Sequence, residues 1–450
     1  MSHQPVDPLS HVTFAHIRLK LTTGPLHRER IIVDKVIGTE SSIDGAAQSG
    51  LRAANRLHIL ETLYQNPGTC RPELAVETGL SRATVASLVE ELQDAGLVTK
   101  DEEQDTSRPR ATGRPPVLLS LVRDAAFAVG LDFGHDHIRV AVCDLSGVSV
   151  ADEWSPAEVD YSPMQSLDLA QLLVNRALDR AGINRERLLG VGMGLAAPIN
   201  GRTGELHAEG ILPGWRGIRP AEEMESRLGV AVRLENDANV GALGERMSGA
   251  GRGVDDMIYV RLSAGIGAGL ILNGQPYSGF GGTAGEIGHV VAKLDGLICR
   301  CGNRGCLETV ASPIAVAGLV ERSIGRPMSV SNLLDAVKEG DRGACRAIAD
   351  AGEAVGQVLS VFVNVLNPEL VVVGGELAAA SNILLDPIQA AIRRHSVATA
   401  SADVRVVTGK LGNRAEVLGA AALILSQSPR ALALQVGLRY ADVPEAAINA

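Results

Sequence analysis

The chain has 450 residues with 46% hydrophobic and 3% aromatic side chains, which predicts large aliphatic cores in roughly two to four domains. Its formal net charge of −10 at pH 7 argues against broad, non-specific nucleic-acid binding, but leaves room for a small DNA-reading module. Residues 1–30 lack an apolar signal core, and no apolar run approaches the ~20 residues that span a bilayer, so we expect a cytoplasmic protein without membrane segments.

Residues 1–50 show no sustained hydrophobic period, and we expect them to form a disordered or weakly ordered arm. Over residues 51–122 the pattern changes to two helices, a glycine turn, a third helix over Arg82–Asp94 and two strands, at 97–99 and 117–121. This order of elements is typical of a winged helix-turn-helix domain.

The third helix and the loop between the two strands carry the candidate DNA contacts. A helix start with small hydroxyl side chains suits phosphate and base-edge contacts in a major groove, and an Arg/Pro/Gly loop suits a neighbouring minor groove. The predicted contacts are Ser81, Arg82, Thr84 and Ser87 on the helix, and Arg108, Arg110 and Arg114 in the loop. The alternative is a solvated three-helix module with an exposed basic loop.

From residue 125 to residue 425 the pattern becomes α/β. Strands at 127–132 and 138–145 are joined by a glycine turn, and strands at 257–262 and 267–272 form a second hairpin of the same kind. Two similar hairpins indicate two similar lobes around a cleft. We leave residues 426–450 as a tail without an assignment.

One histidine and three cysteines follow in the spacing His-x9-Cys-x-Cys-x4-Cys, at His289, Cys299, Cys301 and Cys306. Imidazole nitrogen and thiolate sulfur are the ligands that zinc prefers, and four of them close a structural site, so we predict bound zinc. The alternative is three unpaired cysteines beside a chance histidine. Glu286 and Glu308 flank this cluster, and the two acceptor side chains suit a polyhydroxylated ligand.

The runs Gly285-Glu286-Ile287-Gly288-His289 and Cys299-Arg300-Cys301-Gly302-Asn303-Arg304-Gly305-Cys306-Leu307-Glu308 resemble the ROK family, which groups sugar kinases with sugar-responsive repressors. The resemblance covers residues 125–425, and with the winged module it reaches back to residue 51. It implies an α/β, actin/hexokinase-like two-lobed fold. It also implies zinc on His289 and the three cysteines.

The same resemblance implies a set of sugar-binding residues: Asn236, Asp237, Glu286, His289 and Glu308. In the kinases of the family, the residue matching Asp237 is also the general base that takes the proton from the sugar hydroxyl. An alternative interpretation of Asn236-Asp237 is a turn before a helix, which is common for Asx residues.

The residues that would meet a nucleotide depart from the kinase pattern. In the first hairpin turn His135 replaces a glycine, and Asp136 stands where a threonine hydroxyl would be. A carboxylate beside phosphates costs about 1–4 kcal/mol at intermediate dielectric. The second turn, Ser263-Ala264-Gly265, also lacks its hydroxyl, and Glu376 replaces a third glycine. What remains of a nucleotide site is Asp132, Gly134, Gly265, Gly267, Gly374 and Gly375.

These residues predict a sugar-responsive, DNA-binding transcriptional regulator, a repressor of carbohydrate metabolism genes. Its expected partners are double-stranded operator DNA and a sugar or sugar-phosphate effector. We expect a homodimer or a dimer of dimers, because one winged module reads too few base pairs. The alternative is an ATP-dependent, glucokinase-like sugar kinase fused to a DNA-binding module. A DNA-binding protein with a purely structural role would not explain why the sugar-type residues occur together.

Overall fold

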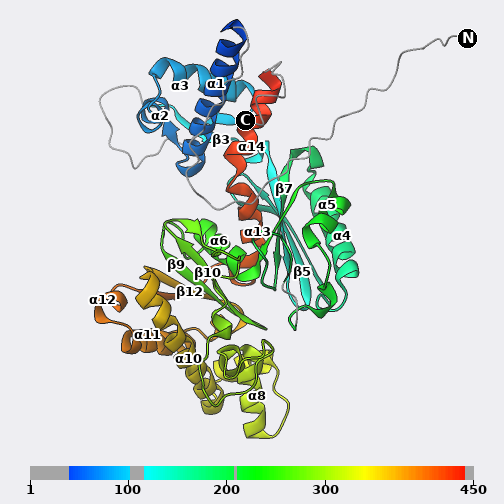
Figure 1. Ribbon diagram of the computed structural model, residues 1–450, viewed down its shortest axis with the longest axis vertical. Coiled ribbons are helices and arrows are strands. Elements are labelled where there is room, and N and C mark those ends of the chain that lie inside the picture. Colours follow the sequence, from blue (N-terminus) through cyan, green and yellow to red (C-terminus); the bar gives the residue numbers. More distant parts are fainter. Residues whose placement is uncertain (1–39, 102–115, 207–209, 441–450) are drawn as a thin grey trace, which may run out of the picture. The chain divides into compact units, whose positions relative to one another are not determined.

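The computed structural model describes residues 40–101, 116–206 and 210–440, with the backbone alone for residues 40–49 and 435–440 (Figure 1). The predicted wing arginines, Arg108, Arg110 and Arg114, therefore lie outside the described residues, as does most of the predicted N-terminal arm. The helix α1 begins at Glu40, earlier than the sequence pattern indicates.

The winged module combines three helices with a small antiparallel sheet of order β1-β3-β2. Its elements are α1 (Glu40–Gln65), β1 (Thr69–Cys70), α2 (Arg71–Thr78), α3 (Arg82–Asp94), β2 (Val98–Lys100) and β3 (Leu118–Leu121). The helix α3 has the predicted bounds, because the Ser81 hydroxyl accepts a hydrogen bond from the Thr84 amide and caps it. The hairpin of β2 and β3 forms as predicted, and β1 is an unpredicted third strand.

Two five-stranded sheets follow, and they share one plan. In each sheet three antiparallel strands are succeeded by two parallel ones, in the orders β6-β5-β4-β7-β8 and β11-β10-β9-β12-β13. The first sheet contains β4 (Phe127–Phe133), β5 (His137–Asp144), β6 (Ser149–Pro156), β7 (Leu188–Leu195) and β8 (Val232–Asn236). The second contains β9 (Met257–Leu262), β10 (Ile266–Leu272), β11 (Gln275–Pro276), β12 (Leu370–Gly374) and β13 (Arg405–Thr408). The shared plan confirms the predicted two-lobed α/β fold.

Helices cover both sheets (Figure 1). Those of the first lobe are α4 (Pro163–Ala181) and α5 (Pro220–Leu228). Those of the second are α7 (Glu308–Ala311), α8 (Pro313–Ile324), α9 (Val330–Lys338), α10 (Arg342–Leu366), α11 (Asn382–His395) and α12 (Ala398–Ser401). In the second lobe α10 packs along α11.

Two further helices connect the lobes: α6 (Asp237–Ser248) and α13 (Ala415–Leu425) pack against each other. The helix α13 also contacts β4 and β7 of the first sheet, whereas α6 contacts β9 and β10 of the second. The two helices approach closely at Gly419, where a Cβ atom would lie 1.6 Å from the carbonyl oxygen of Val240. Only glycine fits there, so the packing of the lobes depends on this position.

The core of the winged module is continuous with the first lobe. One buried cluster includes Leu60 and Leu88 of the winged module, Val417 of α13, and Leu432 of α14 (Ser428–Tyr440). The helices α1 and α14 are in direct contact. The part of the unassigned C-terminal tail that forms α14 is therefore a structural support of the winged module.

Two segments, α10 and residues 412–434, are long and apolar enough to cross a membrane by length and composition. Charged side chains interrupt both segments, so neither shows in the sequence as a continuous apolar run. Burial inside the protein covers 50% of the α10 window and 67% of the other, which is typical of core helices.

Candidate functional site

A cleft between the two lobes, open to solvent, contains every predicted sugar-type residue. Its lining includes Asn236, Asp237, Glu286, His289 and Glu308, together with Gly265 and Gly267. Residues that are far apart in sequence, at the end of β8 and around the cysteine cluster, are thus brought together.

Asn236 and Asp237 lie at the junction of β8 and α6. The Asn236 side-chain oxygen accepts hydrogen bonds from the amides of Ala238 and Asn239, and its nitrogen donates to the Ala197 carbonyl. Asn236 therefore caps α6, and the alternative interpretation of Asn236-Asp237 as a turn before a helix is also confirmed. Asp237, which is buried, keeps one carboxylate oxygen 2.9 Å from Arg261 Nη1.

Two carboxyl groups face the cleft from the other lobe. Glu308 accepts hydrogen bonds from Arg300 Nε at 2.8 Å and from the Ile266 amide at 3.3 Å. Burial, with the nearby charges of Asp237 and Glu308, raises the pKa of Glu286 to about 7. The cleft therefore holds acceptors that can bind hydroxyl groups, with one carboxyl close to its titration point at neutral pH.

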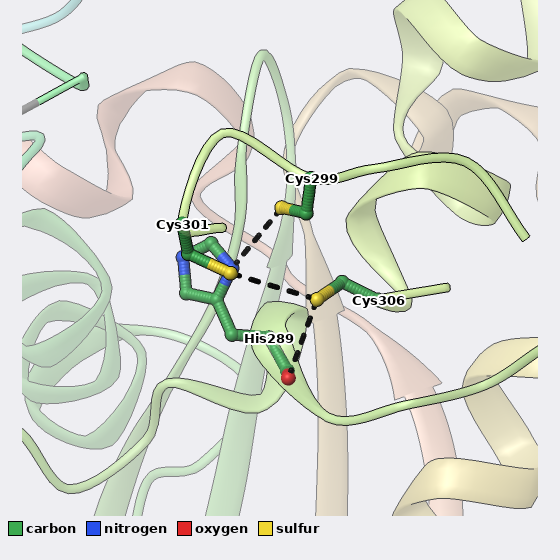
Figure 2. Close-up of side chains that lie close together, drawn as sticks. All are labelled: His289, Cys299, Cys301 and Cys306. Carbon is green, nitrogen blue, oxygen red and sulfur yellow. Dashed lines mark hydrogen bonds between the residues drawn. The ribbon is translucent and has the colours of Figure 1, made fainter. Parts of the chain in front are cut away.

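The four predicted metal ligands converge (Figure 2). Their ligand atoms all lie within 4.8 Å of one another, with 3.7 Å between the sulfur atoms of Cys301 and Cys306 and 3.6 Å from Cys299 Sγ to His289 Nδ1. Tetrahedral zinc with Zn–S bonds of about 2.3 Å places its sulfur ligands roughly 3.8 Å apart. The donor set and its spacing therefore fit a tetrahedral zinc ion.

The ring of His289 faces both sites. Its Nδ1 atom points to the cysteine cluster, whereas its Nε2 atom lies 3.9 Å from the Glu286 carboxylate at the cleft. A metal on Nδ1 would leave a hydrogen on Nε2, so that the ring donates into the cleft. The geometry accommodates both roles predicted for this residue.

The first hairpin turn of the predicted nucleotide-site remnant is occupied by the chain's own side chains. The imidazole of His137 packs on Gly134 and lies 3.3 Å from Asp132 and 2.7 Å from Asp136. Burial lowers the pKa of His137, but the hydrogen bonds and charge of Asp132 outweigh it and raise the pKa overall. His135 instead lines the cleft, and its Nδ1 atom lies 2.8 Å from the Asp160 carboxylate.

The other remnant residues lie outside the cleft lining, except for Gly265 and Gly267. The Ser263 hydroxyl donates to Glu376 at 3.2 Å, which joins the two turns that depart from the kinase pattern. Gly375 has a φ of +80°, and a Cβ atom there would lie 2.4 Å from the Leu262 carbonyl oxygen. Backbone packing therefore accounts for this glycine without a nucleotide.

Sequence reasoning missed Arg261, a buried residue of β9 that also lines the cleft. Its guanidinium lies 2.9 Å from Asp237 and 3.0 Å from Glu416, and Tyr259 donates to the same Glu416 oxygen at 3.0 Å. Burial alone would lower the pKa of Arg261, but the two carboxylates raise it. An arginine inside an otherwise apolar strand is the sequence signal of such a buried ion pair.

On the winged module, the predicted DNA contacts lie at the start and on the outer face of α3. Ser81 and Arg82 are exposed, although the Ser81 hydroxyl is used as the helix cap. Ser87 is also exposed, but its hydroxyl accepts a hydrogen bond from Arg52, which in turn pairs with Glu91. Thr84 is only partly exposed, and its hydroxyl lies 2.8 Å from the Ser81 hydroxyl, so Arg82 is the best placed of these four side chains to meet DNA.

A comparison with known protein families matches residues 128–427 to the ROK family and residues 52–99 to a winged helix-turn-helix DNA-binding family. The chain belongs to the ROK family. This membership confirms the resemblance inferred from the cysteine run.

Among ROK relatives, the chain is 28% identical over 389 residues to a xylose repressor of Caldicellulosiruptor bescii, covering 84% of this chain and 96% of that protein. A solved ROK family transcriptional regulator, described as a homologue of the Escherichia coli MLC protein, superimposes with a TM-score of 0.71 at 25% identity, over 86% of this chain and 99% of that one. A ROK glucokinase of Streptomyces griseus, solved with glucose and AMPPNP, superimposes with a TM-score of 0.60 at 27% identity. This match covers 99% of the glucokinase but only 66% of this chain.

Proposed function

We propose that this ROK protein is a sugar-responsive, DNA-binding transcriptional repressor of carbohydrate metabolism genes. The observation that carries the proposal is a cleft with a full set of sugar-type residues in the same chain as a winged helix-turn-helix module. Its similarity to a xylose repressor and to a solved regulator extends over the winged module, whereas the glucokinase matches a smaller part of the chain.

Within this function, Asp237, Glu286, His289 and Glu308 bind sugar hydroxyls, with Asn236 holding the start of α6. A structural zinc ion on His289, Cys299, Cys301 and Cys306 fixes the loop that carries His289 and leads to Glu308. The winged domain over 51–122 binds operator DNA, the ROK domain over 125–425 binds the effector, and the protein acts in the cytoplasm as a homodimer or a dimer of dimers.

Two observations disfavour the kinase alternative. The Asp237 carboxylate, which would have to take the hydroxyl proton, is engaged by Arg261 at 2.9 Å through one oxygen and by the Ala238 amide at 2.8 Å through the other. The turn that would meet the phosphates is filled by the His137 ring. A carboxylate whose two oxygens already accept hydrogen bonds is poorly placed to take a hydroxyl proton, and a turn filled by the His137 ring leaves less room for phosphates.

Operator release by sugar is the expected behaviour of the purified protein. Genomic fragments that it retains are titrated with protein in the presence of free hexoses, pentoses, N-acetylated hexosamines and their 6-phosphates. One class should raise both the operator Kd and the melting temperature, since a bound sugar stabilises the fold by mass action. An operator Kd that is the same with and without every sugar would contradict the proposal. ADP release by the wild type that disappears in Asp237→Asn would favour the kinase.

The DNA face is tested by Arg82→Ala. Because a phosphate contact releases counterions, we expect weaker operator binding and a decrease of about 1 in the slope of log K against log salt. Sugar affinity should be unchanged. Arg346→Ala, which removes an exposed arginine of α10, is the matched control and should leave the salt slope at its wild-type value. Equal slopes for both variants would place the DNA face elsewhere.

A further inference from the structure

The group around Arg261 joins the two lobes beside the cleft. Arg261 and Tyr259 belong to β9 of the second sheet, whereas Asp237 follows β8 of the first sheet and Glu416 lies in the first turn of α13. All four side chains are buried. Buried ion pairs add little net stability compared with apolar contacts, but breaking one costs several kcal/mol, so they specify one arrangement over others.

One end of this group faces the cleft, and the other end is buried away from it. Arg261 and Asp237 line the cleft, whereas Glu416 does not. The Asp237 carboxylate accepts from Arg261 with one oxygen and from the Ala238 amide with the other. A sugar hydroxyl that binds Asp237 must therefore share an oxygen that already accepts a hydrogen bond. This sharing changes the ion pair between Asp237 and Arg261.

The far end of the group leads to the winged module. Glu416 accepts from Arg261 Nε and from the Tyr259 hydroxyl, and it lies at the start of α13. The helix α13 ends at Leu425, α14 begins at Ser428, and α14 contacts α1 of the winged module. Val417 and Leu432 share one buried cluster with Leu60 and Leu88 of that module.

We propose that Arg261 is the positioning residue that transmits occupancy of the cleft to the winged module, by holding Asp237 and Glu416 together across the two lobes. The inference rests on the proposed repressor function and identifies the residue that connects the cleft to the winged module. Sugar bound at Asp237 shifts Arg261, Arg261 shifts the start of α13, and α14 carries the change to α1. Two sites coupled through one element in this way share a coupling free energy that acts equally in both directions.

The test separates sugar binding from its transmission. The probe comes from the same panel of free hexoses, pentoses, N-acetylated hexosamines and their 6-phosphates, and is the sugar that raises the wild-type melting temperature most. The operator is a genomic fragment retained by the wild-type protein. The coupling ratio is the operator Kd with saturating sugar divided by the Kd without it. In the wild type we expect a ratio of at least ~5, the lower end of typical allosteric coupling.

Glu416→Met removes the acceptor on α13 at similar volume and leaves the Arg261–Asp237 pair in the cleft. We expect its sugar Kd to stay within about threefold of the wild-type value, while its coupling ratio falls below ~2. Tyr259→Phe is the matched control, because it removes the other hydrogen bond to Glu416 and keeps the ion pair. Its coupling ratio should remain close to the wild-type ratio.

Arg261→Lys is the second variant, and it decides the question if Glu416→Met does not fold. Lysine keeps the charge but cannot bridge two carboxylates with a planar fork, so the coupling ratio, measured at saturating sugar, should fall below ~2 even where the sugar Kd changes. A wild-type coupling ratio in either folded variant overturns the inference, as does a parallel loss of sugar affinity and coupling in Glu416→Met. A wild-type protein that binds no sugar of this panel, or binds one without releasing DNA, overturns the proposed function, and the inference falls with it.

Discussion

Cys306→Ser is expected to release the bound metal and to lower the melting temperature by at least about 5 °C. Cys306 is fully buried, and its sulfur lies 3.7 Å from that of Cys301. A structural zinc ion contributes its binding free energy directly to folding, because its ligands are brought together only in the folded chain. The loop that it closes lies between His289 and Glu308, so the sugar response should be lost with the metal.

Metal content by elemental analysis should fall from about one zinc per chain to near zero, whereas operator binding without sugar should persist. Cys345→Ser is the matched control: this half-buried cysteine lies outside the cluster, and its sulfur contacts the Val337 carbonyl. It should retain full metal content and the wild-type response. A Cys306→Ser protein that still carries one zinc ion would remove this residue from the ligand set.

The winged module shows which local signals suffice for prediction. The bounds of α3 followed from a serine cap at Ser81 and a regular apolar face, both of which act within one helix. The strand β1 was missed because two residues are too short to show a period. The first turns of α1 were missed because Glu40–Gly50 lacks a regular apolar stripe.

In the two lobes, the buried hairpins were predictable because their strands are almost continuously apolar. The edge strand β6 escaped detection, since exposed and polar residues interrupt its pattern between Ser149 and Pro156. The same reason applies to α14: its residues carry no clear apolar period, and contact with α1 supplies its stability.

The candidate metal ligands were predictable because three of the four lie within one short loop. The group around Arg261 was not, because Arg261 and Glu416 are 155 positions apart in sequence. The arginine in a buried strand required a partner, but no local feature identified which carboxylate supplies it. Asn236 shows a further limit, since a residue predicted from a resemblance to bind sugar is also committed to capping α6.

Glu308→Ala is expected to weaken sugar binding about 10- to 100-fold, because a hydrogen bond to a charged group contributes about 1.5–3 kcal/mol. Glu308 is largely shielded from solvent, and its carboxylate is oriented by Arg300 and by the Ile266 amide. Because the Glu308 side chain is already held in place, a hydroxyl can bind to it without a further loss of side-chain conformational entropy. Its removal also leaves those two donors without their acceptor, which adds to the loss.

Calorimetric titration with the effector sugar measures this loss, and metal content reports on the neighbouring loop. Zinc should remain, because Glu308 follows the last cysteine and is not a ligand. Glu321→Ala, which removes an exposed carboxylate of α8, is the control and should bind sugar normally. If the Glu308→Ala protein loses both zinc and sugar binding, Glu308 supports the loop and does not contact the sugar. A direct contact predicts that sugar affinity falls while the metal stays in place.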